Sequence, residues 1–322
     1  MEPSIAVLLP CRNEAAAIGA VVRGFRAALP GATVYVYDNA STDDTARIAR
    51  EAGAVVRSEA QPGKGNVVRR MFADVDADVY VIADGDGTYD AAAAPRLIAR
   101  LLDDHLDMAV AARGGETAAF RPGHRAGNVA INQFVARLFR QRVTDMLSGY
   151  RVMSRRFVKS FPALATGFEI ETELTIHALE LRMSFAEIPV PYAARQEGSH
   201  SKLSTWRDGI RILAAILFLF KEVRPFRFFG ALFLVLTVIS VVLVYPLIVT
   251  FLQTGLVPRL PTAVLATGVM LAAIFCLLCG TILDTVSRGR REAKRMRYLS
   301  IPPPAAVFRP VQAGASARIS HG

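Results

Sequence analysis

The stretch Val79-Tyr80-Val81-Ile82-Ala83-Asp84-Gly85-Asp86-Gly87 is the most informative part of this chain for its fold. Five apolar residues bounded by Asp78 and Asp84 predict a short buried strand over Val79–Ala83. Asp84 and Asp86 follow that strand directly, and two adjacent carboxylates repel each other unless a positive group lies between them. A turn of sequence Asp-Gly-Asp is the simple alternative. After a buried strand, the pair favours a divalent cation with oxygen ligands, such as Mg²⁺ or Mn²⁺.

The same alternation of strand and polar loop extends through the first 110 residues. Short apolar runs predict four more strands, over Ile5–Leu9, Thr33–Tyr37, Ala54–Arg57 and Met108–Ala112. Helical patterns lie between them, over Ala15–Leu29, Thr42–Ala52, Lys64–Val75 and Ala92–Asp103. Strands that alternate with helices predict an α/β fold, a Rossmann-like and mainly parallel sheet with helices on both faces.

Each of the first four predicted strands is followed by a polar or glycine-rich cluster. These clusters are Pro10–Glu14, Asp38–Asp44, Pro62–Asn66 and Asp84–Gly87. Ligands of such sheets bind beyond the carboxyl ends of the strands, so we expect the clusters to meet at one edge. Taken singly, each has a simpler interpretation. The second cluster is rich in residues that cap helices, and Gly63-Lys64-Gly65 lacks the spacing of a phosphate-binding P-loop and reads as a turn.

The net charge of +10 is concentrated in the apolar C-terminal part of the chain. From Phe226 onward there are 10 Lys/Arg against 2 Asp/Glu, whereas the first 225 residues hold 28 against 26. A nearly neutral N-terminal part argues against a nucleic-acid partner, and positive charge beside apolar segments favours a membrane surface. With 52% hydrophobic residues and three cysteines, the chain is neither a disordered protein nor a disulfide scaffold.

Two uncharged segments are long enough to cross a bilayer. The first covers the 31 positions between Arg227 and Arg259, and the second the 24 positions between Arg259 and Asp284. About 20 apolar residues in a helix span the hydrocarbon core, so we predict transmembrane helices at about 228–252 and 262–283. The alternative is a buried helical hairpin in a soluble core. Basic residues flank both outer ends, and the N-terminus has no signal peptide, which predicts that both ends are cytoplasmic.

The segments around these spans complete the predicted organisation. Trp206–Phe220 carries its charges first and apolar residues afterwards, which fits a helix in the membrane interface or an ordinary packed helix. We therefore expect a cytoplasmic domain over residues 1–203, a juxtamembrane amphipathic helix over 204–226 and two transmembrane helices within 227–286. A basic tail over 287–322, rich in proline, alanine and glycine near its end, is expected to be disordered.

Several motifs, in order, resemble those of the family 2 glycosyltransferases with the GT-A fold, and in particular the polyprenyl-phosphate glycosyltransferases. Leu9–Glu14 is similar to the family's P-x-Y-N-E opening, Asp38–Asp43 to its D-D/N-G-S-x-D, and Asp84-Gly85-Asp86 stands at its D-x-D. Asp145–Arg151 resembles the D-x-x-x-[FY]-R region, and Gly198–Leu203 the G-x-S-K segment before the membrane region, each one residue longer here.

The resemblance implies a role for each matching position. A nucleotide diphosphate sugar and its metal would be bound by Pro10, Arg12, Glu14, Asp38, Lys64, Asp84, Gly85 and Asp86, with Asp84 and Asp86 as ligands of Mg²⁺ or Mn²⁺. The acceptor phosphate would be bound by Arg113, Arg125, Arg151, Arg195, Ser201 and Lys202. The alternative for each of the arginines and the lysine is an ordinary surface charge. Asp86 and Asp145 would be catalytic; Asp145 would position the acceptor or take a proton, and a helix cap is the alternative. Glu169, Glu171 and Glu173 either open a helix or border the donor site.

The implied activity is inverting, metal-dependent transfer of a hexose from a nucleotide sugar to a polyprenyl phosphate. It would take place at the cytoplasmic face of the plasma (inner) membrane, with membrane lipid and a second copy of the chain as further partners. The enzyme alternative is a processive polysaccharide or other glycolipid synthase, but Trp206-Arg207 reverses the order of that class's Q-x-x-R-W motif and two spans are few for a channel. A non-catalytic scaffold has no need of the Asp84 and Asp86 pair.

Overall fold

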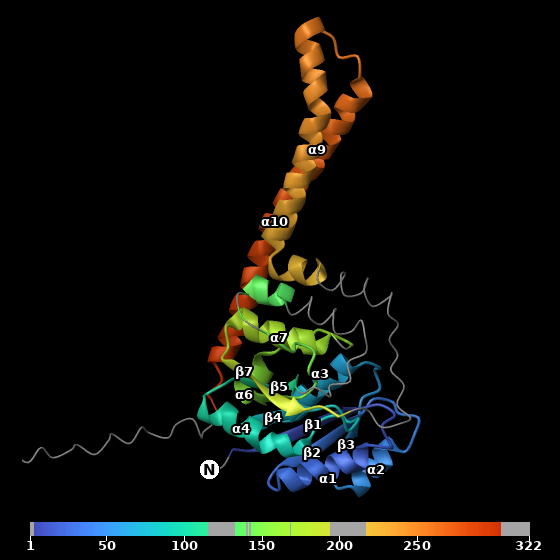
Figure 1. Ribbon diagram of the computed structural model, residues 1–322, viewed down its shortest axis with the longest axis vertical. Coiled ribbons are helices and arrows are strands. Elements are labelled where there is room, and N and C mark those ends of the chain that lie inside the picture. The colour runs from blue at the N-terminus through green and yellow to red at the C-terminus, as the bar shows by residue number, and fades with distance from the viewer. Residues whose placement is uncertain are drawn as a thin grey trace, which may run out of the picture. The chain divides into compact units, whose positions relative to one another are not determined.

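The protein was analysed as a computed structural model, which describes residues 3–114, 133–139, 141, 143–167, 169–193 and 217–303. A seven-stranded sheet forms its N-terminal part, in the order β3-β2-β1-β4-β6-β5-β7 (Figure 1). The strands are β1 (Ile5–Cys11), β2 (Thr33–Asp38), β3 (Val55–Ser58), β4 (Val79–Ile82), β5 (Met108–Gly114), β6 (Arg151–Ser154) and β7 (Phe185–Pro191).

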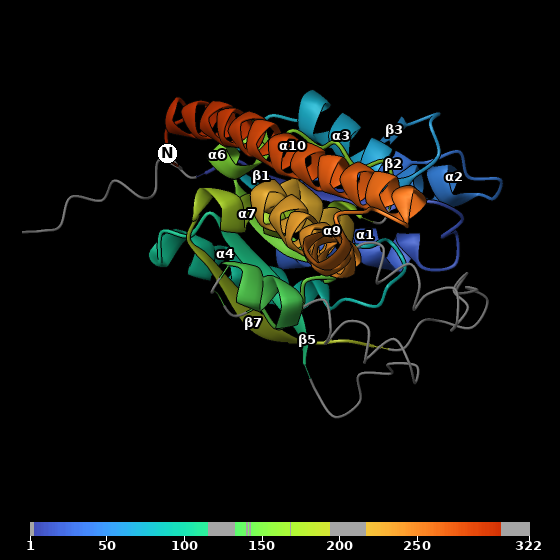
Figure 2. The ribbon, with the colours of Figure 1, turned by 90° about the horizontal axis from the view of Figure 1, so that it is seen from above.

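Six of the seven strands run in the same direction. β1 pairs in parallel with β2 and β4, β2 with β3, and β5 with β7, which lie side by side at one edge (Figure 2). β6 is antiparallel to both of its neighbours, β4 and β5. Its first residue, Arg151, therefore pairs with Ile82 at the end of β4. The antiparallel strand thus brings the chain before Arg151 to the edge where the parallel strands end.

Helices cover both faces of the sheet, as the alternating pattern predicted. They are α1 (Ile18–Ala28), α2 (Thr45–Glu51), α3 (Lys64–Asp74), η1 (Ala91–Ala93), α4 (Ala94–Asp103), α6 (Arg155–Ser160) and α7 (Ile170–Leu181). One core joins α1, α2 and α4 to alternate strand residues such as Val7 and Val81. A second core joins α3, α6 and α7 to the strand residues that lie between these, such as Leu8 and Tyr80. The period of two along a strand divides its side chains between these cores.

The structure confirms the mainly parallel α/β fold and adds elements that the sequence pattern did not predict. These are β6, β7, α6 and most of α7. The four residues of β6 are all buried, and β6 is too short to show a period of its own. α7 begins at Ile170 with Glu171 and Glu173 in its first turn, so the helix-opening interpretation of these glutamates is confirmed. Carboxylates are favourable there because the helix dipole is positive at that end.

Two long helices, α9 (Pro225–Thr254) and α10 (Leu260–Leu299), are long and apolar enough to cross a membrane. They contact each other through small residues. The buried residues of α10 are Ala266, Ala273 and Gly280, spaced by seven, and Ser240 of α9 donates to the Ala266 carbonyl at 2.8 Å. Seven-residue spacing keeps one seam facing the partner helix, and small residues let two membrane helices approach closely. Most other apolar side chains on both helices are exposed.

The predicted disorder of residues 287–322 is corrected for 287–299, because α10 continues as one helix to Leu299. The chain divides into two compact units. The first contains Met1–Ser201 and Lys294–Gly322, and the second contains Lys202–Ala293. Within the first unit, Lys294 pairs with Glu180 at 3.0 Å, and the Tyr298 hydroxyl donates to Asp107 at 2.9 Å. These contacts hold the last turns of α10 in order. Residues 304–322 lie outside the described residues, as does most of the expected interfacial helix, of which 217–223 are helical.

Candidate active site

The carboxylates predicted to bind the donor all act electrostatically on one buried thiol. Cys11, at the end of β1, is only 3% exposed. Burial raises the pKa of its thiol, and the negative charges of Glu14, Asp38, Asp84 and Asp86 raise it further. These residues follow β1, β2 and β4, so the carboxyl ends of three parallel strands gather four carboxylates in one place, as the sheet rule predicts.

The loops after β1 and β2 hold each other in place. Asn13 has a φ of 56°, a left-handed conformation that asparagine tolerates better than most residues. Its backbone N–H donates to the Ser41 hydroxyl at 2.9 Å, and its side-chain oxygen accepts from the Thr42 N–H at 2.8 Å. Asp43 accepts from the Ala15 N–H at 3.1 Å. These bonds fix the positions of Glu14 and Asp38 beside the two loops.

Asp38 is buried beside an asparagine that ties three loops together. The Oδ2 atom of Asp38 accepts from the Ser41 N–H at 3.3 Å, whereas its buried Oδ1 has no hydrogen-bond partner among the described residues. The Asn39 amide donates to the carbonyls of Glu59 and Gln61 and accepts from the Gly63 N–H at 2.8 Å. A buried acceptor without a donor is costly, so Asp38 Oδ1 is suited to a hydroxyl or N–H of a ligand.

Lys64 links two carboxylates that are far apart in the sequence. At the start of α3, its ammonium donates to Asp84 and to Glu171 of α7. The lysine side chain is 12% exposed and that of Glu171 9%. Burial alone would lower the pKa of Lys64, but the two carboxylates outweigh it and the pKa is raised. Lys64 therefore stays charged, and its cation lies beside the first carboxylate of the Asp84 and Asp86 pair.

Two glycines allow the Asp84 loop to pack closely. A Cβ atom on Gly85 would collide with Cys11 Sγ, and one on Gly149 would collide with the Asp84 carboxylate. Asp86 is 5% exposed and accepts from the Thr88 N–H at 3.1 Å and the Thr88 hydroxyl at 2.7 Å. Asp84 is thus in contact with both Lys64 and the backbone at Gly149.

The residues present fit a divalent cation that shares its ligands with a substrate. No group of three or more histidine, cysteine, aspartate or glutamate side chains within the described part of the chain forms a complete metal site. Glu14, Asp38, Asp84 and Asp86 nevertheless all act electrostatically on the Cys11 thiol, and Lys64 is paired with Asp84. Such a donor set suits Mg²⁺ or Mn²⁺ held by one or two carboxylates together with phosphate oxygens and water.

Asp145 is held in a two-point ion pair with Arg113. Arg113 donates from Nε to Asp145 Oδ2 at 2.8 Å and from Nη2 to Oδ1 at 2.6 Å. Glu187 of β7 accepts from the backbone N–H groups of Thr144 and Asp145 and fixes the turn. Both oxygens of Asp145 are thus engaged by the Arg113 guanidinium. The catalytic role of Asp145, as a group that positions the acceptor or takes a proton, and the assignment of Arg113 to the acceptor phosphate stay predictions.

The expectation that Arg151 binds the acceptor phosphate is corrected, because the structure makes Arg151 part of the core. It is fully buried in central strand β6. Its guanidinium donates to the carbonyls of Ser148 and Met146 at 3.0 and 2.6 Å and to the Thr175 hydroxyl at 2.9 Å. Burial lowers its pKa. Arg151 therefore fastens the turn before β6 to α7 and does not face a ligand.

The remaining predicted positions divide between the surface and parts of the chain that are not described. Pro10 is half-buried within β1, and Arg12 is exposed just after it. Arg125, Arg195, Ser201 and Lys202 lie outside the described residues. Glu171 is the main contributor that the sequence left open, since its partner Lys64 is 107 positions away and no local pattern connects them. Gly149 was missed for the same reason, because it lies against Asp84, 65 positions away.

Comparison with known proteins gives the family. The Glycosyl transferase family 2 model matches residues 6–161. An uncharacterized protein of Shigella flexneri (SF2094/S2216) is 54% identical over 48% of this chain and 95% of its own length. In Haloferax volcanii, glycosyltransferase AglJ is 30% identical over 92% of this chain and 98% of its own, and dolichyl-phosphate hexose transferase is 29% identical over 66% and 92%.

Solved structures share the fold and contain ligands. Glucosyl-3-phosphoglycerate synthase of Mycobacterium tuberculosis, in complex with Mn²⁺, UDP and phosphoglyceric acid, superposes with a TM-score of 0.56 and 25% identity, covering 68% of this chain and 78% of that one. Another structure of the same enzyme contains Mg²⁺ and UDP. With the GT-A-like sheet and the matching relatives together, this chain is a glycosyltransferase that belongs to glycosyl transferase family 2.

Proposed function

We propose that the chain transfers a hexose from a nucleotide diphosphate sugar to a polyprenyl phosphate at a membrane surface, in a reaction that needs Mg²⁺ or Mn²⁺. The observation that carries this proposal is that the carboxylates of Glu14, Asp38, Asp84 and Asp86 all act on the buried Cys11 thiol at the edge where the parallel strands end, with the Lys64 ammonium paired to Asp84. Carboxylates at this edge suit a divalent cation that also binds the oxygens of the donor diphosphate.

The donor's parts correspond to separate residues of the site. Asp38 Oδ1, buried without a donor among the described residues, would accept from the nucleoside. Asp84 and Asp86 would hold the metal, which when bound supplies charge stabilisation to the departing diphosphate. Lys64 would place a second positive charge beside Asp84, where it adds to the neutralisation of phosphate oxygens. Thr88 keeps Asp86 in one orientation for this task.

Independent observations support the acceptor assignment. Two relatives that match most of their length are a glycosyltransferase and a dolichyl-phosphate hexose transferase. In this chain the two long apolar helices would hold it at the membrane, where a polyprenyl chain resides. A phosphate monoester is already anionic, so its oxygen can attack the sugar without a strong general base, which agrees with the engagement of Asp145 by Arg113.

The proposed reaction is a single displacement at the anomeric carbon. A bond forms between that carbon and an acceptor phosphate oxygen, and the bond to the donor diphosphate breaks with its electron pair on the leaving nucleoside diphosphate. This course inverts the anomeric configuration. The chain's own contribution is to hold both phosphates close together, which converts a bimolecular step into one between positioned groups. We propose that the catalytic unit and both outer ends of the two apolar helices lie on the cytoplasmic side of the plasma membrane.

Transfer is tested with purified full-length protein, a panel of radiolabelled nucleotide sugars and undecaprenyl phosphate, followed by solvent extraction. We expect label in the lipid phase for one sugar, only with Mg²⁺ or Mn²⁺ present. Asp84→Asn should remove the lipid-linked label, and Asp103→Asn, an exposed change at the end of α4, should retain it. Label in a long polymer, or lipid-linked label that persists in chelator, would contradict the proposal.

A further inference from the structure

The hydroxyl of Tyr89 is a buried polar group to which the proposed reaction assigns no task. Tyr89 is 8% exposed, and its oxygen accepts from the Gly149 N–H at 2.9 Å. The same oxygen lies 3.5 Å from the Ser148 hydroxyl. Since Ser148 donates its proton to the Ala111 carbonyl at 2.6 Å, the Ser148 oxygen is left to accept from Tyr89. The Tyr89 hydroxyl thus ties its ring to the turn that precedes β6.

That turn lies directly against Asp84. A Cβ atom added to Gly149 would collide with the Asp84 carboxylate, so only a bare backbone fits there. Burial raises the pKa of Tyr89, and the negative charge of Asp84 raises it further. The hydroxyl therefore keeps its proton near neutral pH and can both donate and accept. The contacts run without a gap from the Tyr89 oxygen through the Gly149 backbone to the carboxylate.

The ring of Tyr89 is fixed from two sides. It makes edge-to-face contacts with Tyr150 and Tyr192, with ring centroids 5.5 and 5.2 Å away. Tyr89 and Tyr192 also form an antiparallel backbone bridge just beyond the end of β7, and the Ala193 N–H donates to the Thr88 carbonyl at 3.0 Å. A side chain locked by such packing holds its polar atom in one place. The hydroxyl can therefore hold the turn in one position.

The neighbouring Tyr150 shows what a purely structural tyrosine is like in this cluster. Tyr150 is completely buried, and its ring packs edge-to-face on Phe25 at 5.9 Å. Its hydroxyl has no hydrogen-bond partner among the described residues. Phenylalanine would keep the ring contacts of Tyr150 and lose nothing polar. At Tyr89, by contrast, phenylalanine would leave the buried Gly149 N–H without its acceptor.

We propose that Tyr89 is a positioning residue of the active site, whose hydroxyl holds the Gly149 backbone against Asp84 and so keeps that carboxylate oriented for a divalent cation. The inference rests on the proposed role of Asp84 as a metal ligand. Partners that orient a ligand from behind are worth about 10–100-fold in metal affinity. Tyr89 acts through one intermediate group, so we expect an effect of about tenfold, the lower limit of that range.

The test is titration of the full-length protein with Mn²⁺ alone, with free Mn²⁺ measured by electron paramagnetic resonance. Tyr89→Phe should bind Mn²⁺ about tenfold more weakly than wild type. Tyr150→Phe is the matched control, since it removes a buried hydroxyl from the same aromatic cluster, and it should bind like wild type. Wild-type affinity in Tyr89→Phe, or an equal loss in Tyr150→Phe, would overturn the inference.

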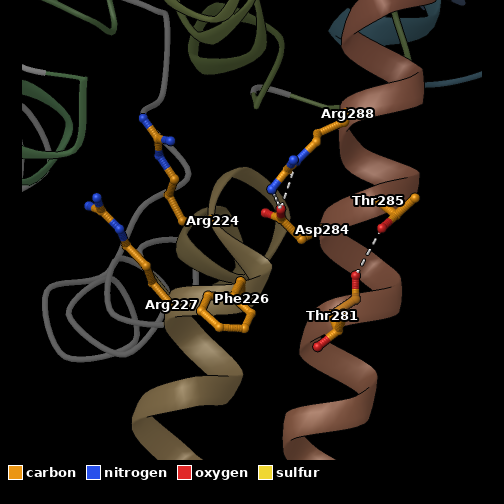
Figure 3. A pocket seen from close by; sticks show the side chains of 7 residues that line it. All are labelled: Arg224, Phe226, Arg227, Thr281, Asp284, Thr285 and Arg288. Carbon is orange, nitrogen blue, oxygen red and sulfur yellow. Dashed lines mark hydrogen bonds and ion pairs between the residues drawn. The ribbon is translucent and has the colours of Figure 1, made fainter.

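A pair of aspartate variants keeps this outcome distinct from failure of the proposed function. Asp84→Asn should abolish the binding. Asp284→Asn makes the same chemical change in the other compact unit, where Asp284 accepts from Arg288 at 2.9 and 2.6 Å (Figure 3), and should bind Mn²⁺ like wild type. If Asp84→Asn loses Mn²⁺ and Tyr89→Phe does not, only the positioning role fails. Full binding by Asp84→Asn, or equal losses in both aspartate variants, would refute the metal site and the inference with it.

Gly149→Ala tests the same contact with Tyr89 intact. Its methyl group displaces the Asp84 carboxylate, so Mn²⁺ binding should weaken without any change at the tyrosine. Because both substitutions act on one contact, Tyr89→Phe combined with Gly149→Ala should bind only slightly more weakly than the weaker single variant. Fully additive losses would show that Tyr89 acts by another route. Wild-type affinity in Gly149→Ala would by itself overturn the inference, even if Tyr89→Phe does not fold.

Discussion

Replacement of Lys64 by methionine isolates the charge that holds the active site together. Lys64→Met keeps the length and most of the apolar stem but removes the ammonium that pairs with Asp84 and Glu171. Both carboxylates then face each other without a cation. Glu171, at 9% side-chain exposure, has little water to compensate for this loss, whereas Asp84, at 29%, is partly hydrated.

The expected destabilisation follows from this burial. Removal of one partner from a buried ion pair costs about 3–5 kcal/mol, and the partial exposure of Asp84 places this case near the lower limit, at about 3 kcal/mol. For a domain of this size, that is a fall of about 9 °C in melting temperature. Scanning calorimetry or fluorescence-monitored melting of the full-length protein in chelator measures it without metal or nucleotide.

A double-mutant cycle separates repulsion from lost packing. Lys64→Met with Glu171→Gln leaves Asp84 as the only charge of the three, so at least half of the lost stability should return. Arg47→Met breaks exposed pairs with Asp44 and Glu51 on α2 and should change the melting temperature little. If Lys64→Met melts like wild type, or if the double variant is as unstable as the sum of the single ones, the three-residue charge cluster does not control this region.

Four further outcomes test other parts of the structure. Asp86→Asn removes a charge from the carboxylate pair at nearly constant volume and should lower the transfer rate at least about a hundredfold, measured with saturating Mn²⁺. Gly149→Ala should displace the tip of the Asp84 side chain and lower transfer with little change in melting temperature, whereas Gly31→Ala, which meets no atom within 4 Å, should affect neither. Burial, reinforced by the charge of Lys294, lowers the pKa of His177 to about 3. The stability that the neutral His177 contributes is complete above the unfolded pKa near 6.5. It is lost as the pH falls from there towards 3, by up to about 1.4 kcal/mol per pH unit. His177→Phe should flatten the melting temperature across that pH range, and an unchanged slope would refute the assignment. A cysteine placed at Val257 should react with an impermeant thiol reagent from outside intact cells, and reaction only after lysis would reverse the proposed topology.

The sequence was most informative where function or membrane insertion imposes a local pattern. Short apolar runs predicted the first five strands, because four of them are largely buried and their composition needs no distant residue to explain it. The edge strand β3 is mostly exposed. The two uncharged segments gave α9 and the apolar part of α10 because only length and apolarity are required for a span. Asp38, Asp84 and Asp86 were predicted together, since parallel strands bring their carboxyl ends to one edge.

The sequence was least informative about charged side chains whose partners are far away. Arg113 and Arg151 were both predicted to bind the acceptor phosphate. Arg151 is instead enclosed in the core, whereas Arg113 is paired with Asp145 and its assignment stays a prediction. Composition cannot distinguish these cases, because an arginine satisfied by carbonyl groups and one that faces a ligand have the same local sequence. The end of α10 was misread as a disordered tail for a similar reason, since Lys294 and Tyr298 find their partners on distant elements.

By itself, then, the sequence determined the alternation of strands and helices, the edge of the sheet where the chemistry gathers, and the two apolar helices. These follow from periodicity and from the cost of placing charge in hydrocarbon, which act over a few neighbouring residues. Only the tertiary structure decided that β6 runs antiparallel and brings Gly149 against Asp84, and that Glu171 completes the pair around Lys64. Those contacts join residues 65 and 107 positions apart, and their energies depend on burial and distance, which exist only once the chain has folded.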